Sequence, residues 1–358
     1  MASPLLGVLF HWLGGLASAS FYVPFRKVRG WSWEIYWLIG GFFSWIFAPW
    51  IFAYFRTEDL FGVLANADTP TLILCVVYGL LWGLGGLTFG LTMRYLGLSL
   101  GMAVALGLCA FFGTLIPPML KGVFFSEVLP TTHGQIVLAG LVLCLLGIAI
   151  VGVGGICKEQ ESTPEDRQKN IAEFDLRKGL LVALFCGLMS SCFAFGISAG
   201  EPLAALSAAA GTHPLFKGLP VICVVLIGGA TTNFLWCAYL IAKNKSASEI
   251  FQPNVQPKLP SSTNSPASSG INLFWCALAG VLWYFQFFFY VMGESQMGEY
   301  GFSSWTLHMA SIIIFSSLWG FALNEWKGSS RKTLRYVMIG LSFLVSSTIL
   351  IGYGNSLA

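Results

Sequence analysis

The sequence has 358 residues, of which 56% are hydrophobic and only 10% are charged, and its formal net charge is +3. A soluble globular domain is typically about 45–50% apolar and about 25% charged, so this chain has too few polar side chains to cover a water-facing surface. The composition excludes a soluble globular enzyme and a disordered chain. The lack of a clustered basic patch also excludes a nucleic-acid binder. The solvent that fits this composition is a lipid bilayer.

Ten long apolar runs follow one another along the chain. A helix needs about 20 apolar residues to cross a bilayer core about 30 Å thick. Membrane barrels instead show segments of about 10 residues with strict alternation, and no such pattern is found. The sequence therefore predicts an all-α integral membrane protein with ten transmembrane helices. These are expected over residues 4–24, 34–55, 71–93, 97–120, 134–156, 179–200, 215–242, 271–293, 302–324 and 333–354.

The first run shares one feature with a secretory signal, since residues 17–19 (Ala-Ser-Ala) resemble a cleavage site. The first basic cluster, at residues 26–29, follows the apolar run instead of preceding it. We therefore expect this run to be retained as a transmembrane helix of the mature protein.

The basic residues are divided unequally between the two sides that ten spans define. Of the 19 Lys and Arg residues, 16 fall in the links after helices 1, 3, 5, 7 and 9. The other three are Arg56, Lys121 and Lys217. Cytoplasmic loops carry an excess of Lys and Arg, so the odd-numbered links are predicted to be cytoplasmic and both termini to be external.

Two longer polar links suggest how the chain is organised. Residues 157–178 are predicted to be a cytoplasmic linker between two five-helix halves, 1–156 and 179–358. Residues 243–270, rich in Ser, Pro and Asn, are predicted to be a flexible cytoplasmic loop. Because five is an odd number, equivalent helices of the two halves cross the membrane in opposite directions. This is the inverted-repeat plan of many secondary transporters.

Weak sequence matches between the halves agree with that plan. Helix 1 matches helix 6 at an offset of 172, and helix 3 matches helix 8 at an offset of 201. The matching residues are Gly7, Gly15, Leu16, Ser18 and Phe21 with Gly179, Gly187, Leu188, Ser190 and Phe193, and Gly79, Leu81 and Trp82 with Gly280, Leu282 and Trp283. The chain is therefore predicted to form two inverted repeats.

Polar side chains deep in the spans are rare, and three fall at one predicted depth. His11, Gln286 and His308 each lie six or seven residues inside the outer end of a helix. Aromatic residues accompany them, and the predicted binding residues among these are Trp12, Trp82, Trp283 and Tyr284. Aromatic faces beside amide and imidazole groups suit a sugar, whose CH face stacks on a ring while its hydroxyls need directed partners. Two alternatives stay open: the histidines can bond one helix to another, and the aromatic residues can be interfacial anchors.

Coupling to protons requires a titratable group that changes its environment. Histidine is suited to this because its unperturbed pKa is about 6.5, so His11 and His308 are candidates. Glu34, at the start of helix 2, is a further candidate, although an acid in a first turn also complements the helix dipole. Arg94 ends helix 3 on the predicted cytoplasmic side, where it is either a topology anchor or a partner of Glu34 in an inner gate.

The sequence has no HExxH motif and no P-loop, and its loops are too short to hold an ATPase domain. We therefore expect a secondary carrier and not an enzyme or a primary pump. We expect no metal and no cofactor, and the candidate co-substrate is a proton. A metabolite or drug exporter and an uncoupled carrier are the alternatives.

Four stretches closely resemble the L-rhamnose–proton symporter family of the drug/metabolite transporter superfamily. They are FYVPFRKVRGWSWE (21–34), WGLGGLTFGLTMRYLGLSLG (82–101), LWYFQFFFY (282–290) and SWTLHM (304–309). The resemblance implies ten helices as five plus five, a bacterial inner-membrane location, and uptake of L-rhamnose with a proton, with L-lyxose as a second candidate sugar.

The resemblance also carries over individual positions, namely His11, Glu34, Arg94, Trp283, Tyr284, Gln286 and His308. Our hypothesis for their roles assigns hydroxyl contacts to Gln286 and His308, stacking to Trp283 and Tyr284, and the proton to Glu34 or His11. The loop at 243–270 and the link at 293–301 depart from the family pattern, which bears on the choice of sugar. The oligomeric state stays open.

Overall fold

The computed structural model describes residues 3–96, 98–161, 175–251, 268–324 and 326–357, and within these ranges the chain is helical with no strand. Ten helical segments there are long and apolar enough to cross a membrane, which confirms the predicted class and number of spans. They are Pro4–Phe25, Trp33–Arg56, Thr69–Leu96, Leu100–Leu120, Thr132–Glu161, Leu176–Ala209, Pro214–Asn244, Ser269–Glu294, Gly301–Ala322 and Arg331–Ser356.

Several spans are built from more than one helical element. The first half contains α1 (Pro4–Ser20), α2 (Tyr22–Phe25), α3 (Trp33–Gly41), the π-helix η1 (Phe42–Phe47), α4 (Ala48–Arg56), α5 (Leu60–Ala65), α6 (Thr69–Leu96), α7 (Leu98–Leu120), η2 (Phe124–Val128) and α8 (Thr132–Glu161). The second half contains α10 (Leu176–Ala199), α11 (Glu201–Ala209), η3 (Pro214–Phe216), α12 (Leu219–Asn244), η4 (Ser246–Ile250), α13 (Ser269–Glu294), η5 (Gly298–Ser303), α14 (Ser304–Ala322) and α15 (Arg331–Ser356).

The predicted linker between the halves is shorter than its polar composition indicated. Helix α8 continues to Glu161, and α10 begins at Leu176. The Asp175 carboxylate caps α10 by accepting the Lys178 backbone N–H at 3.1 Å, and this bond holds the pKa of Asp175 below its ordinary value. Residues 162–174, and residues 252–267 of the predicted loop, lie outside the described ranges.

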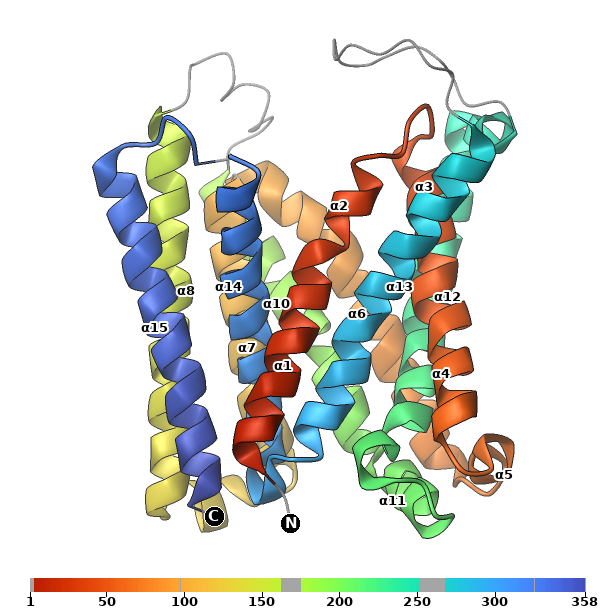
Figure 1. Ribbon diagram of the computed structural model, residues 1–358, viewed down its shortest axis with the longest axis vertical. Helices are drawn as coiled ribbons and strands as arrows, with labels where there is room; N and C mark the ends of the chain where they lie inside the picture. Colours follow the sequence, from red (N-terminus) through yellow and green to blue (C-terminus); the bar gives the residue numbers. More distant parts are fainter. Residues whose placement is uncertain (1–2, 97, 162–174, 252–267, 325, 358) are drawn as a thin grey trace.

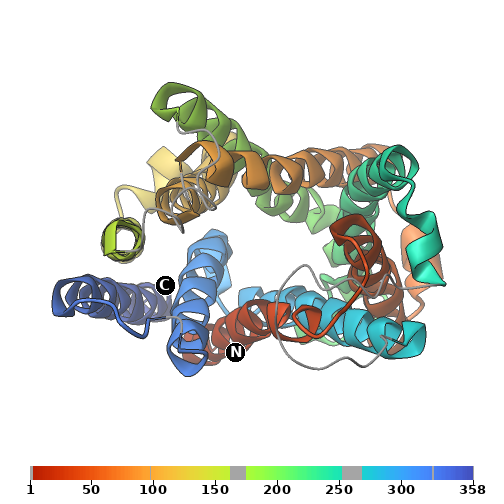
Figure 2. The same ribbon diagram turned by 90° about the horizontal axis from the view of Figure 1, so that it is seen from above.

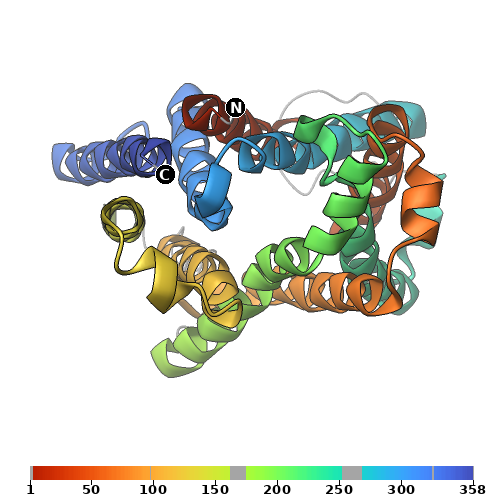
Figure 3. The ribbon, with the colours of Figure 1, turned by 90° about the horizontal axis from the view of Figure 1, so that it is seen from below.

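The helices are arranged in two rows, which are seen when the bundle is viewed along the helix axes. Figure 1 shows both chain termini at one end of the bundle, together with α5 and α11, and we call this end the terminal face. Seen along the bundle in Figures 2 and 3, α1, α13 and α14 make up one row, and α6, α7 and α10 make up the other. Helices α3 and α12 join the rows at one edge, and α8 pairs with α15 at the opposite edge.

Glycines bring neighbouring helices into backbone contact, as between α6 and α12. A Cβ at Gly79 of α6 would lie 2.0 Å from the Val225 carbonyl oxygen of α12, and a Cβ at Gly228 would lie 2.2 Å from the Val76 carbonyl oxygen. Apolar burial does not drive helix association in lipid, so close packing of small residues takes its place. These contacts hold the framework around the cavity described next.

Candidate functional site

A cavity of about 530 Å³ lies between the two rows at the terminal face. Its walls come from α7, α10, α11, α12, α13 and the segment that leads into α14. Four charged residues line it: Lys121, Glu201, Lys217 and Glu294. Its deep end is lined by Tyr290 and Trp305 together with the small or aliphatic side chains of Ala194 and Ile197. The cavity is therefore charged at its mouth and aromatic at its deep end.

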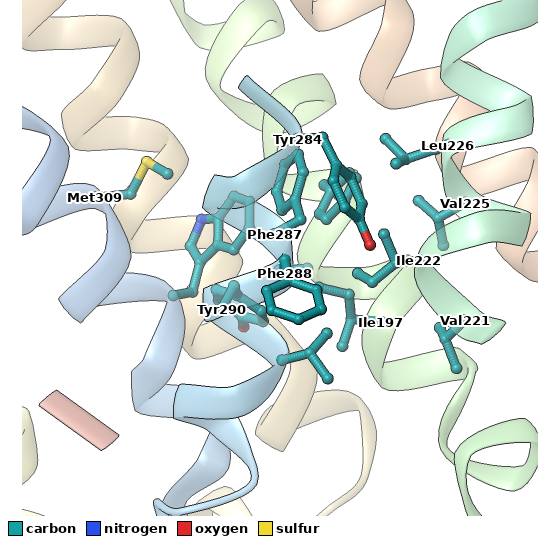
Figure 4. Close-up of a cluster of buried hydrophobic side chains, with 14 of the residues drawn as sticks. Ile197, Val221, Ile222, Val225, Leu226, Tyr284, Phe287, Phe288, Tyr290 and Met309 are labelled. Carbon is teal, nitrogen blue, oxygen red and sulfur yellow. The ribbon is translucent and has the colours of Figure 1, made fainter. Parts of the chain in front are cut away.

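Four aromatic rings that contact one another lie at the deep end of this cavity and behind it. We call Phe193, Phe287, Tyr290 and Trp305 the aromatic floor. The rings of Phe193 and Phe287 stack at 4.0 Å, and Phe193 also stacks on Trp305 at 6.0 Å. Figure 4 shows the aromatic side chains of α13 packed toward the aliphatic side chains of α10 and α12.

The position of Trp305 depends on a glycine and a hydrogen bond. Its indole N–H donates to the Cys109 carbonyl oxygen of α7 at 3.1 Å. A Cβ at Gly113 would lie 2.3 Å from the indole ring, so the absence of a side chain there gives the ring its space. These contacts hold the indole at the deep end of the cavity.

The two predicted histidines lie behind the floor, on either side of one tyrosine. The ring of Tyr290 is 5.3 Å from the His11 ring and 5.4 Å from the His308 ring, both edge-on. Both imidazoles are fully buried, and none of their nitrogen atoms has a hydrogen-bond partner among the described residues. The hydroxyl of Ser311 donates to the backbone carbonyl oxygens of both histidines at 2.9 and 2.8 Å, which ties α1 to α14 at this level.

Two tryptophans from different halves meet beneath the floor. The rings of Trp82 and Trp283 are 5.8 Å apart, and they contact Phe193 and Phe287 from below at 5.1 and 5.2 Å. Along α13, Trp283 lies seven residues, or about 10 Å, farther from the terminal face than Tyr290. The tryptophan pair is therefore shielded from the cavity by the floor.

The mouth of the cavity carries one ion pair and two further charges. Lys121 at the end of α7 pairs with Glu201 at the start of α11. Lys217 and Glu294 line the same mouth, and neither is in an ion pair within the part of the chain that the structure describes. Both lysines lie within electrostatic range of the Glu294 carboxylate.

The L-rhamnose-proton symport protein (RhaT) family matches residues 2–357 of the chain. The chain belongs to this family. An L-rhamnose-proton symporter of Mannheimia succiniciproducens is 36% identical to it over 98% of both chains. L-rhamnose-proton symporters of Yersinia pestis and Yersinia pseudotuberculosis are each 34% identical to it, again over 98% of both chains.

The structure of this symporter-family chain brings some predicted site residues together around the aromatic floor and places others elsewhere. His308, Trp82 and Trp283 contact the floor directly. Gln286 points instead toward α1, where its side-chain oxygen accepts from the Ser18 hydroxyl at 3.0 Å and its N–H donates to the Trp283 carbonyl oxygen at 2.9 Å. The Gln286 amide thus bonds α13 to α1 and has a donor and an acceptor already engaged.

The other two predicted aromatic contacts lie away from the cavity. Tyr284 is fully buried against Phe52 of α4, with ring centroids 5.7 Å apart. Trp12 packs edge-on against Phe315 of α14 at 6.0 Å. Neither side chain lines the cavity at the terminal face.

Glu34 and Arg94 lie in different surroundings at the opposite end of the bundle. The Glu34 carboxylate accepts hydrogen bonds from the Asn244 side chain and the Ser246 hydroxyl, each at 2.9 Å, so it joins the start of α3 to the end of α12. Arg94 lies near the end of α6, where the Asp175 backbone N–H just before α10 donates to the Tyr95 carbonyl oxygen at 3.2 Å. Their pairing in an inner gate stays a prediction.

The sequence analysis missed the charged mouth, and none of the four floor residues is among its predicted binding residues. Phe193 and Phe287 lie in apolar runs with no polar signal to mark them, and Glu294 falls in the link at 293–301. A signal was available for the lysines, since Lys121 and Lys217 are two of only three basic residues assigned to that side. Cations on the side that has few of them indicate a local requirement for positive charge.

Proposed function

We propose that this chain imports L-rhamnose together with a proton by alternating access. The observation that carries the proposal is membership of the symporter family over residues 2–357, in a chain whose terminal face holds an aromatic-floored cavity. A 6-deoxy sugar has an apolar CH face and a methyl group that suit Tyr290 and Trp305. Its hydroxyls suit the charged mouth above them.

The basic residues support an orientation in the membrane. Sixteen of the 19 fall in the odd-numbered links of the sequence, and the described ends of these links lie at the end of the bundle opposite the termini. This supports a cytoplasmic location for that end and an external terminal face. On this assignment the cavity is open to the outside of a bacterial inner membrane. The sugar enters it, reaches the aromatic floor, and next meets Trp82 and Trp283 when the floor opens.

Equivalent contacts in the two halves support the proposed inverted repeats. At the offset of 201, Trp82 is equivalent to Trp283, and these rings meet at the centre of the molecule. Ser18 is equivalent to Ser190 at the offset of 172, and Gln286 is equivalent to Gly85 at the offset of 201. Ser18 bonds Gln286, and Ser190 likewise lies against Gly85, where an added Cβ would be 2.5 Å from the Ser190 nitrogen. The helix pairings agree as well, because α1 packs on α13 and α14 as α10 packs on α6 and α7.

A proton supplies enough free energy for accumulation. One pH unit contributes about 1.4 kcal/mol per proton, and a membrane potential of 100 mV adds about 2.3 kcal/mol per charge. Together they support a concentration gradient of several hundredfold for one proton per sugar. His308 is a candidate for sugar contact behind the floor, and Glu34 and His11 remain the candidates for the proton that sequence reasoning supplied.

Reconstitution into proteoliposomes tests the proposal. We expect radiolabelled L-rhamnose to accumulate when the external pH is one unit lower, and addition of L-rhamnose to a lightly buffered suspension to raise the external pH. L-Mannose is the matched sugar control, because it differs from L-rhamnose only in having a hydroxymethyl group in place of the methyl group. L-Lyxose tests the second candidate sugar. Uptake without a pH change would refute symport, and absence of L-rhamnose uptake would refute the substrate.

A further inference from the structure

We propose that Glu294 and Lys217, at the mouth of the cavity, form the pair that couples proton binding to sugar binding. The inference deepens the proposed symport and rests on it. It assigns the proton to the Glu294 carboxylate, and it assigns a hydroxyl contact of the sugar to the Lys217 ammonium. Neither residue was predicted from the sequence to have a role.

Glu294 is one of two acids that line the cavity, and the other, Glu201, is paired with Lys121. Glu294 ends α13 one helical turn beyond Tyr290, so its side chain stands directly above the aromatic floor on the same helix face. It is half-buried, and its side chain lies against η5, since a Cβ at Gly301 would be 3.7 Å from its Cγ. Within the described part of the chain, the Glu294 carboxylate takes part in no ion pair.

The residues on either side of Lys217 hold the backbone there against α13, while the Lys217 side chain itself is exposed. Phe216 stacks on Phe288 with ring centroids 5.7 Å apart, and a Cβ at Gly218 would lie 3.1 Å from Val291. Phe288 and Val291 lie on successive turns of α13, and Glu294 lies on the turn that follows them. The other lysine at the mouth, Lys121, is already paired with Glu201.

Among the side chains that the structure describes, the other titratable groups near Glu294 and Lys217 are either paired or enclosed. Facing it are Lys121 from α7, Glu201 from α11, Lys217 beside η3 and Tyr290 from its own helix. His11 lies on the other side of α13 against Gly293, and His308 lies behind Tyr290, both without contact with the cavity. A proton that arrives from the terminal face therefore meets Glu294 before it can reach either imidazole.

The coupling arises because the charges of Glu294 and Lys217 decide whether the mouth of the cavity can close. Burying a single charge without any partner is strongly unfavourable, whereas a neutral group, an ion pair or a charge that keeps a hydrogen-bond partner costs less to bury. When Glu294 is ionised it can pair with Lys217, so the empty carrier can close. When Glu294 binds a proton it releases Lys217, and the ammonium then needs a new partner before it can be buried.

A sugar hydroxyl is that partner. The protonated carrier closes with sugar bound and stays open without it, and the ionised carrier closes only when the cavity is empty. These rules allow one proton and one sugar to cross together and prevent either from crossing alone. The proton enters as a simple addition to the carboxylate oxygen and leaves the same way when the site faces the cytoplasm.

Two variants in proteoliposomes test the pair. Glu294→Gln imitates the protonated state permanently, so we expect exchange of labelled for unlabelled L-rhamnose to persist while accumulation driven by one pH unit falls from about tenfold to none. Its affinity for L-rhamnose should no longer depend on pH. The double variant Glu294→Gln with Lys217→Met removes both charges, so it should carry L-rhamnose downhill with no proton movement.

The controls separate this inference from the proposed function. Glu58→Gln removes an exposed acid at the same face that does not line the cavity, and it should accumulate sugar like the unmodified protein. Glu294→Asp keeps a titratable group, so it should remain coupled, with a shift in the pH at which accumulation is half-maximal. This variant still tests the inference if the Gln variant does not fold. Proton-driven accumulation by Glu294→Gln would overturn the inference and leave the symport intact, whereas failure of the unmodified protein to take up L-rhamnose would overturn the proposed function itself.

Discussion

Phe193 is the residue whose removal tests the aromatic floor most directly. Its side chain is fully buried and contacts the rings of Trp82, Phe287 and Trp305 at 5.1, 4.0 and 6.0 Å. Each aromatic pair contributes about 0.5–1.5 kcal/mol, so Phe193→Ala should remove about 1.5–4.5 kcal/mol from the closed floor. Since 1.4 kcal/mol is a factor of ten, the floor should open about ten to a thousand times more often.

The expected result is a leak. Proteoliposomes that contain Phe193→Ala should lose preloaded L-rhamnose and dissipate an imposed pH gradient faster than those with the unmodified protein. Phe185→Ala is the matched control, because Phe185 lies on the same helix and is 45% exposed. If a folded Phe193→Ala protein retains sugar and the pH gradient as well as the control does, the aromatic floor is not the barrier.

Three further substitutions test packing around the cavity. Gly113→Ala should push the Trp305 indole from its place, because the new Cβ lies 2.3 Å from the ring, and should raise the KM for L-rhamnose about tenfold. Ser18→Ala should remove the donor to Gln286 and lower the thermal midpoint by the equivalent of about 0.6 kcal/mol, with a transport rate within about twofold of normal. Gly79→Val should separate α6 from α12 and abolish a monodisperse elution profile in detergent, because its Cβ lies 2.0 Å from a backbone oxygen that cannot move aside.

Matched glycines on the same helices serve as controls. A Cβ at Gly107 of α7 has its nearest contact at 3.8 Å, so Gly107→Ala should keep the normal KM. A Cβ at Gly86 of α6 meets nothing within 4 Å, so Gly86→Val should elute normally. Equal effects of the test and control substitutions would mean that the close contacts at Gly113 and Gly79 do not matter.

The number of spans could be predicted because length and apolarity are properties of a segment alone. Each run that crosses a bilayer needs enough apolar residues to span it, and polar links mark where it ends. The sixth span was the least accurate, since the run ends near Gly200 while α11 continues it to Ala209. The Pro at the second position of α11 allows a new helix to start there, and an apolarity count does not detect such a restart.

Depth along a helix was only partly readable from the sequence, and direction around it was not. His11 and His308 lie on either side of Tyr290, whereas Gln286 lies one helical turn, or about 6 Å, farther along α13 from the terminal face. Gln286 nevertheless faces Ser18, and both imidazoles are enclosed behind Tyr290. In a soluble helix the polar stripe reveals which face meets solvent. A membrane helix is apolar on the faces toward lipid and toward protein alike, so that information is missing.

The two halves of the molecule suggest where the cavity goes when the carrier turns inward. At the offset of 172, Ile197 on the wall of the open cavity is equivalent to Phe25, which lines a pocket of only about 10 Å³ at the other end of the bundle. The Phe25 ring fills the space over Gly40, since a Cβ at Gly40 would lie 2.5 Å from it. Trp283 lines that small pocket too, and it already touches Trp82 and the underside of the floor. If the halves exchange conformations, as the inverted-repeat plan requires, Phe25 must leave Gly40 while Ile197 closes in, so a sugar beneath the floor would pass along Trp283 toward the basic end of the protein.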